Sequence, residues 1–359
     1  MTSVQYSVPR PLGRRPRRTL GAVVATVVLV VAASGCGDDS SDDSAPSAAT
    51  SAPADEDVAD AWTPSPTTAG AVGEPPFPVV VDHPLGSTTI EAEPARIVAL
   101  TDGGELATLL ALDLQPVAAG ARTDPQVPWI DELLADDVEL FTGPDPGGEI
   151  NLETIAGFSP DLIIGQEDVI TEPTLELLQE IAPTVATPRS GWRDQLRIVG
   201  AATGRVDAAD ALAMATEAEL AAFDPELDGP APSLAFVIGV PDIVFSFTEL
   251  SAIGTVMTDA GLAPLEAPIA NDFDDDEANM YSPEELEALD ANVIVVLDPF
   301  GGSLETLEEN PLWASLPAVQ DDQIVYFDAD DARATRFDSV LTVPVNLGLL
   351  QRIFAESNS

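Results

Sequence analysis

The stretch that decides the fold is RIVALTDGGELATLLAL, residues 96–112. It opens on the apolar run Ile97–Leu100, which is typical of a buried strand. Leucines then recur at helical spacing, so a helix is expected over 103–112. A strand that leads directly into a helix is the β–α unit of a parallel sheet, and open α/β sheets bind their ligands at the carboxyl ends of such strands. The turn Thr101–Gly104 therefore lies where a ligand would bind.

The same alternation of strands and helices continues along the chain. A first set of strands is expected at 97–100, 115–120, 162–164 and 184–187, and a second set at 234–238, 243–247, 292–297 and 324–327. Helices are expected over 173–181, 192–203, 252–260 and 340–354. The alanine-rich helix at 206–223 separates the two sets and is interpreted as a rigid connector. This order predicts an α/β fold with two Rossmann-like lobes joined by a single long connecting helix.

The composition restricts the class of partner. The chain has 359 residues, with 62 Asp and Glu against 14 Arg and no Lys, and its formal net charge is −48. The first 36 residues hold five of the Arg and no acid, which leaves 9 Arg against 62 acids, about −53, in the remainder. Such a charge repels nucleic acid and anionic membrane surfaces. One Cys excludes an internal disulfide, and one His disfavours a His-based metal or triad site.

The amino terminus indicates export. Arginines precede an apolar run, Leu20–Val31, of signal-peptide length. The sequence ASGC at 33–36 is similar to a bacterial lipobox, so we expect cleavage before Cys36 and lipidation of its thiol. The alternative is an ordinary signal peptide with an incidental Cys. The sequence RRTL at 17–20 leaves the twin-arginine route open beside the general secretory route.

The domain boundaries follow from these patterns. The segment after Cys36 is rich in Ser, Ala, Asp, Thr and Pro, and it has too few bulky apolar residues to offset the cost of ordering its backbone. We expect a protein anchored by lipid to the outer face of the cell membrane. Its parts would be a signal peptide with lipidated Cys at 1–36, a disordered tether at 37–75, an N-terminal lobe at 76–205, the connecting helix at 206–228 and a C-terminal lobe at 229–359.

Catalysis is poorly supported by the sequence, so no enzyme activity is predicted. The chain lacks a nucleophile elbow, a phosphate-binding loop and a dinucleotide fingerprint. His83 falls in a predicted hairpin turn, where a solvated or capping role is favoured over a ligand role. The acidic run Asp274–Glu277 lacks calcium-loop spacing, so a solvated loop is favoured over a cation site. No metal ligand is assigned.

The few arginines are the strongest candidates for a ligand site. Arg122 and Arg189 each follow a strand of the first set, and Arg333 and Arg336 follow the last strand of the second set. A guanidinium presents a planar fork to oxygen atoms and stacks on flat groups. Trp192 and Trp129 could add a flat apolar wall, although either could belong to the core. The alternative for each arginine is a surface ion pair. The predicted ligand-binding residues are Arg122, Arg189, Trp192, Arg333 and Arg336.

At residues 78–355 the chain resembles a family, the substrate-binding lipoproteins of ABC importers for ferric siderophores and cobalamin (class III, with a long connecting helix). Eight segments carry the resemblance by their order and spacing: LGSTTI at 85–90, EPARIVAL at 93–100, NLETI at 151–155, SPDLII at 159–164, SPEEL at 282–286, LDANVI at 289–294, NPLW at 310–313 and LPAV at 316–319. The resemblance implies a ligand cleft between the lobes and little hinge motion.

The resemblance also implies partners. One Glu in each lobe would dock on arginines of the membrane permease, and by motif these are Glu153 and Glu284. The alternative is simple capping of the helices that they open. The expected function is capture of a ferric siderophore and its delivery to the ABC permease by a monomeric protein without a cofactor, since the ligand is itself an iron chelate.

Three alternatives stay open. They are a cobalamin-binding or a haem-binding protein of the same fold, and a structural or signalling lipoprotein that transports nothing. The class of chelate also stays open, because arginines favour an anionic catecholate or carboxylate complex, whereas the acidic background favours a cationic hydroxamate complex.

Overall fold

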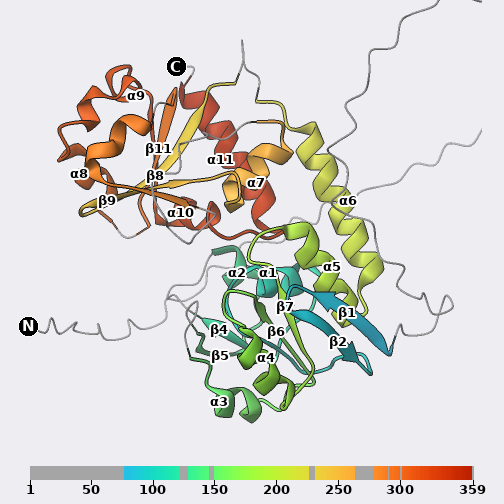
Figure 1. The fold of residues 1–359 in the computed structure, drawn as a ribbon. Coiled ribbons are helices and arrows are strands. Elements are labelled where there is room, and N and C mark those ends of the chain that lie inside the picture. Colours follow the sequence, from blue (N-terminus) through green and yellow to red (C-terminus); the bar gives the residue numbers. More distant parts are fainter. Residues whose placement is uncertain are drawn as a thin grey trace, which may run out of the picture. The chain divides into compact units, whose positions relative to one another are not determined.

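The structure is a computed structural model that describes residues 77–121, 128–144, 149–225, 231–262, 278–289, 291–299 and 301–357. The predicted signal peptide, the predicted lipidation site Cys36 and the predicted tether lie outside these residues, as do Arg122 and the acidic run Asp274–Glu277. The described part contains two five-stranded sheets and a separate two-stranded hairpin, together with the helices that cover them (Figure 1).

The hairpin opens the described chain. Strand β1 (Val79–His83) pairs antiparallel with β2 (Gly86–Ile90), as predicted. His83 stabilises the turn: its Nε2 lies 3.0 Å from Thr88 Oγ1, and its Nδ1 accepts from the Leu85 N–H. Burial lowers the pKa of His83 against the opposing effect of Asp82, so the ring favours the neutral form. The bonds confirm a capping role, in a side chain that is buried rather than solvated.

The first sheet is entirely parallel, as predicted. Its strand order is β5-β4-β3-β6-β7. The strands are β3 (Ile97–Ala99), β4 (Ala118–Ala121), β5 (Glu139–Thr142), β6 (Leu162–Gln166) and β7 (Thr184–Thr187), and the helices that connect them are α1 (Gly104–Ala111), α2 (Pro128–Leu133), α3 (Leu152–Gly157) and α4 (Glu172–Gln179). The order reverses at β3, which has β4 on one side and β6 on the other, so the turn at Thr101 lies at the topological switch point.

Helices α5 (Trp192–Thr203) and α6 (Val206–Ala222) lie side by side (Figure 1). They are separated by Gly204, whose φ of 70° is in the left-handed region that ends a helix without steric cost in glycine. The two helices can pack closely because position 200 of α5 is a glycine. A Cβ at Gly200 would lie only 2.7 Å from Ala209 Cβ of α6. The 17-residue α6 is the long connecting helix that the sequence predicts.

The second sheet has the order β10-β9-β8-β11-β12. Its strands are β8 (Leu234–Val240), β9 (Ile243–Phe247), β10 (Ala278–Tyr281), β11 (Val293–Leu297) and β12 (Ile324–Phe327). Strands β8, β11 and β12 are parallel, but β9 pairs antiparallel with both of its neighbours, β8 and β10, so this sheet is mixed and does not simply repeat the first. The associated helices are α7 (Ala252–Asp259), the 3₁₀ turns η1 (Pro283–Ala288) and η2 (Trp313–Ser315), α8 (Ser303–Glu308), α9 (Pro317–Gln320), α10 (Ala329–Ala334) and α11 (Thr342–Ser357).

The largest hydrophobic cluster is shared by both sheets and by the helices between them. It includes Trp192 and Val199 of α5, Leu220 of α6, and Phe327 and Leu350 of the second lobe. Two smaller clusters cover the remaining faces of the two sheets. A continuous core of this kind opposes independent movement of the lobes, because separating them would expose apolar surface to water.

Candidate functional site

The carboxyl end of β3 is closed by a buried carboxylate. Glu105, in the first turn of α1, is fully buried, and its Oε1 accepts from the Thr101 N–H at 2.9 Å and from Thr101 Oγ1 at 2.6 Å. These two bonds connect the turn after β3 to the first turn of α1. The sequence places Thr101 at the ligand-binding edge but gives no sign that Glu105 turns back to bind it.

Two glutamines surround this turn. Gln166 ends β6, and a Cβ at Gly103 would lie 2.6 Å from its Oε1. Gln195 of α5 is fully buried, and a Cβ at Gly104 would lie 2.4 Å from its Oε1. The glycines thus let two neutral polar side chains approach the start of α1. Both glutamines were missed from the sequence, because neither belongs to a motif.

Gln195 also fixes the loop after β7. Its Nε2 donates to the carbonyls of Pro188 and Arg189 at 3.2 and 3.3 Å. The N–H of Arg189 donates to Glu167 Oε1 at 3.3 Å, so the loops after β6 and β7 are bonded to each other. The backbone of the predicted ligand residue Arg189 is therefore held at the carboxyl edge of the sheet, and its side chain is half-buried.

The loops that carry Arg189 and Arg336 meet. The N–H of Gly191 donates to Oδ2 of Asp338, which lies two residues after Arg336. Asp338 is 3% exposed, so this bond joins the two lobes at a buried point. The structure thus brings together two segments, one from each lobe, whose arginines are predicted from the sequence to bind the ligand.

The other predicted ligand residues are placed differently. Arg333, on α10, binds Asp330 Oδ1 at 2.9 Å, which matches the ion-pair alternative, and Arg336 is exposed just beyond that helix. Trp192 is fully buried in the core, and the guanidinium of Arg193 lies 4.3 Å from its ring centroid. This placement favours the core alternative for Trp192 over a wall of the ligand site. Arg122 and the side chain of Trp129 lie outside the described residues.

An acid and a phenol occupy the carboxyl edge of the second sheet. Tyr326 of β12 donates its hydroxyl to Oδ2 of Asp298, which follows β11, at 2.6 Å. Burial acts to raise the pKa of Asp298, but the Tyr326 hydroxyl and the N–H groups of Ser303, Gly302 and Gly301 outweigh it and hold that pKa below its usual range. The hydrogen bond to Asp298, with smaller effects of burial and nearby acids, raises the pKa of Tyr326 to about 12.

The two predicted docking residues occupy equivalent positions. Asn151 caps α3 by accepting from the Thr154 N–H, and Glu153 is the second residue of that helix. Ser282 precedes η1, and Glu284 is likewise its second residue. Both glutamates are exposed, and within the described part of the chain neither forms a hydrogen bond or ion pair.

The neighbour of Glu284 has a different role. Glu285 Oε2 accepts from both the N–H and the hydroxyl of Ser282, each at 2.9 Å, and these bonds lower the pKa of Glu285. Capping is therefore performed by Glu285, which leaves Glu284 available to a partner.

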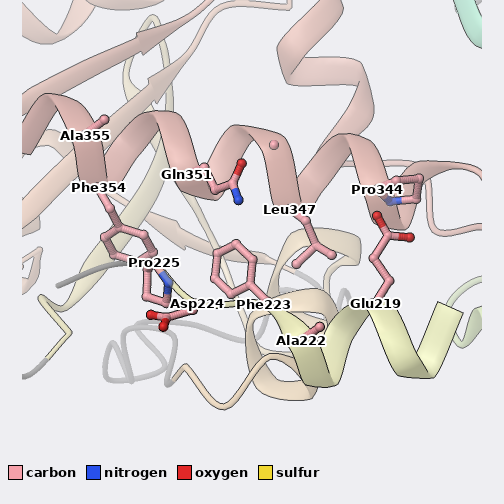
Figure 2. A pocket seen from close by; sticks show the side chains of 11 residues that line it. Glu219, Ala222, Phe223, Asp224, Pro225, Pro344, Leu347, Gln351, Phe354 and Ala355 are labelled. Atoms are coloured by element: carbon pink, nitrogen blue, oxygen red, sulfur yellow. The ribbon is translucent and has the colours of Figure 1, made fainter.

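Three hollows lined by described residues have volumes of about 800, 470 and 480 Å³. The first lies where the end of α6 meets α11, with Phe223 and Leu347 between the two helices (Figure 2). The second is lined by Glu284, and the third adjoins the start of α3. None of the three is lined by a predicted ligand-binding residue.

The described residues contain no cluster of three or more His, Cys, Asp or Glu side chains arranged to hold a metal ion. Within the same residues, no helix combines the length and apolar character that a membrane span needs.

Comparison with known proteins decides the family. The family described as periplasmic binding protein matches residues 98–330, which is more than half of the chain. The chain belongs to this family. That match covers the first sheet from β3 onward, both long helices α5 and α6, and all strands of the second sheet.

Particular relatives of this periplasmic binding protein are also similar. The probable siderophore-binding lipoprotein YfiY of Bacillus subtilis is 41% identical over 130 residues, which are 35% of this chain and only 39% of that relative. The putative ABC transporter substrate-binding lipoprotein YhfQ of the same organism is 24% identical over 264 residues, 70% of this chain and 81% of the relative. The solved structure of the iron uptake ABC transporter substrate-binding protein PiaA of Streptococcus pneumoniae is 25% identical with a TM-score of 0.62, covering 77% of this chain and 99% of PiaA.

Proposed function

We propose that this periplasmic binding protein captures a ferric siderophore outside the cell membrane and delivers it to an ABC permease, without a chemical step. The observation that carries the proposal is the 41% identity with a protein described as a siderophore-binding lipoprotein. The structure adds support, because the loops that carry Arg189 and Arg336 are joined through Gly191 and Asp338. Arginines on these two loops suit the oxygen atoms that surround iron in a chelate.

The proposal assigns roles to particular residues. Arg189 and Arg336 contact the chelate, together with Arg122, whereas Trp192 contributes to the core. Glu153 and Glu284 dock on arginines of the permease. Cys36 carries the lipid that holds a monomeric receptor at the outer face of the membrane, which keeps the captured chelate close to the permease.

Ligand binding is tested with protein that lacks residues 1–36. Intrinsic Trp fluorescence is titrated with ferric hydroxamates, catecholates and carboxylates, and with haem and cobalamin. Saturable quenching by one ferric class at submicromolar concentration is expected, and the Arg189→Gln and Arg336→Gln variants should bind more weakly. The iron-free siderophores are the control. Folded protein that binds none of the ferric complexes would overturn the proposal, and saturation by haem or cobalamin instead would reassign the ligand.

Delivery is tested by uptake of radioactive iron into cells whose own copy of the gene has been deleted. The Glu153→Ala and Glu284→Ala variants should bind the chelate normally but support slower uptake. Glu287→Ala is the matched control, since Glu287 is an exposed residue of the same turn as Glu284. Wild-type uptake in both docking variants would exclude this docking role, and wild-type uptake in cells without any copy of the gene would favour a lipoprotein that does not act in transport.

A further inference from the structure

A hollow of about 470 Å³ adjoins Glu284 in the second lobe. We call it the Glu284 hollow. Three segments line it: the turn between β8 and β9, the start of η1, and the end of α8 with the residues that follow. Its lining residues used below are Pro241, Asp242, Glu284, Glu309, Pro311 and Leu312.

The Glu284 hollow combines an apolar floor with an acidic rim. Pro241 and Pro311 are exposed and Leu312 is half-buried, so these residues give the hollow an accessible apolar surface. Asp242, Glu284 and Glu309 are exposed, and no lining residue is basic. A hollow of this composition suits a cationic group attached to an apolar body, and it repels anionic groups.

The walls of the hollow are held in place by hydrogen bonds. Asn310 Nδ2 donates to the Pro283 carbonyl at 2.7 Å, and Asn310 Oδ1 accepts from the Leu312 N–H at 2.9 Å. Asn310 thereby ties the start of η1, and with it Glu284, to the chain after α8. A surface fixed in this way loses little conformational entropy when a partner binds.

The first lobe has a comparable feature beside Glu153. A hollow of about 480 Å³ lies between the end of β5 and the start of α3, and its lining includes Phe141, Ile150 and the exposed Glu149. Each proposed docking glutamate is therefore close to a hollow that has both apolar and acidic lining.

We infer that the Glu284 hollow receives a basic loop of the permease. An arginine of that loop lies among the three rim carboxylates, and an apolar side chain beside it contacts Pro241 and Leu312. Charge complementarity selects this occupant, because the guanidinium pairs with carboxylates while its aliphatic stem covers apolar surface. The inference rests on the proposed function and extends it from one docking glutamate to a shaped recognition site.

The rim is tested with Glu284 left in place. The double variant Asp242→Asn and Glu309→Gln removes two negative charges, and Asn tolerates the positive φ of 66° at position 242. Uptake of radioactive iron should fall about three- to tenfold, since each exposed charge pair contributes modestly. The control is Asp210→Asn with Glu219→Gln, which removes the same charge from exposed positions on α6 and should leave uptake unchanged.

The shape of the hollow is tested by filling it. Pro311 is exposed, so Pro311→Trp can fold while its indole occupies the space over the floor. Uptake should fall although all three rim carboxylates remain. Wild-type uptake by either the rim variant or Pro311→Trp overturns the inference.

Fluorescence titration separates this inference from the proposed function. Both variants should bind the ferric chelate as tightly as the wild-type protein, and their thermal unfolding should confirm that they are folded. Failure of the wild-type protein to bind any ferric siderophore defeats the proposed function itself. Normal binding and normal uptake by the variants defeat only the inference about the hollow.

Discussion

The phenol of Tyr326 shows how one carboxylate alters the acidity of its neighbour. Its hydrogen bond to Asp298 stabilises the protonated phenol, and ionisation would place two negative charges side by side. Asp298 is itself held ionised by backbone N–H groups, so it stays a charged acceptor across the physiological range. Tyr326 therefore presents a neutral hydroxyl at the edge of the second sheet.

Replacing Asp298 by Asn should lower the pKa of Tyr326 from about 12 toward the ordinary value of about 10. The amide can still accept the hydrogen bond, but it carries no charge that opposes ionisation. The measurement is ultraviolet absorbance of the phenolate during alkaline titration. A Tyr281→Phe background without residues 1–36 leaves Tyr326 as the single tyrosine. Asp321→Asn is the control, and an unchanged pKa in Asp298→Asn would contradict the assigned cause.

Residue roles differ in how far the sequence predicts them. A cap such as Asn151 is a local interaction, so its residue type and its position before a helix suffice to predict it. Gln195 was missed, because its contacts with Pro188, Arg189 and Gly104 exist only after α5 packs against the first sheet. Arg333 could be assigned to an ion pair or to a ligand from its neighbours alone, and only the three-dimensional structure reveals its bond to Asp330.

Elements with strong terminal signals were predicted closely. Helix α5 ends at Thr203, before the cap Gly204, and strand β12 is a compact run of apolar and aromatic residues, so both match their expected bounds. Strands β5 and β10 were missed, because ELFT and ANMY are short and neither has a sustained alternating pattern. Both lie at sheet edges, and their pairing depends on β4 and β9. For the same reason the antiparallel part of the second sheet could not be predicted from strand order.

Replacing each of two helical glycines by alanine should change the free energy of unfolding in opposite directions. Gly200→Ala on α5 should lower the free energy of unfolding by about 1–3 kcal/mol, because the added Cβ would meet Ala209 Cβ of α6 at 2.7 Å. Gly348→Ala on α11 should raise it by about 0.5–1 kcal/mol, because no atom lies within 4 Å and alanine favours the helix. Urea unfolding measures both. A gain of stability in Gly200→Ala would contradict the close contact of α5 and α6.

The cap of α3 is a second test at this scale. Asn151→Ala should lower the free energy of unfolding by about 1 kcal/mol, because the Thr154 N–H loses its acceptor. Thr171→Ala at the start of α4 is the control, since Thr171 forms no side-chain bond to the backbone of its helix. Urea unfolding compares the two variants, and an equal loss of stability would mean that Asn151 does not act through its cap bond.

Arg193 connects three helices that belong to different parts of the molecule. Its guanidinium binds Glu217 of α6 at 3.0 Å and Asp259 of α7 at 2.7 Å, so one side chain of α5 connects the first lobe, the long helix and the second lobe. Partial burial acts to lower the pKa of Arg193, but these two carboxylates outweigh it and raise that pKa. With the bond from Gly191 to Asp338 and the shared core, this arrangement favours a fixed relation between the lobes.

Arg193→Gln should therefore lower the free energy of unfolding by about 1–2 kcal/mol, through the loss of two partly exposed ion pairs and the cation–π contact with Trp192. Amide hydrogen exchange should accelerate in α7 as well as in α5. Arg197→Gln is the matched control, because Arg197 lies on the same helix and pairs with Asp194 of its own helix at 3.1 Å. Equal effects of the two substitutions would contradict a connecting role for Arg193.

The net charge predicts how the whole molecule responds to salt. Without residues 1–36 the chain carries about −53, and repulsion among these charges favours expansion. Salt also weakens the described ion pairs, but exposed pairs contribute only about 0–1 kcal/mol each, so the relief of repulsion should dominate. Raising NaCl from about 0.02 to about 0.5 M, which shortens the screening length to a few ångströms, should therefore increase the Tm. Calorimetry of protein lacking residues 1–36 measures this change, with glucose at equal osmolality as the uncharged control. A Tm that falls with NaCl would mean that specific ion pairs, rather than overall repulsion, govern the stability of this acidic protein.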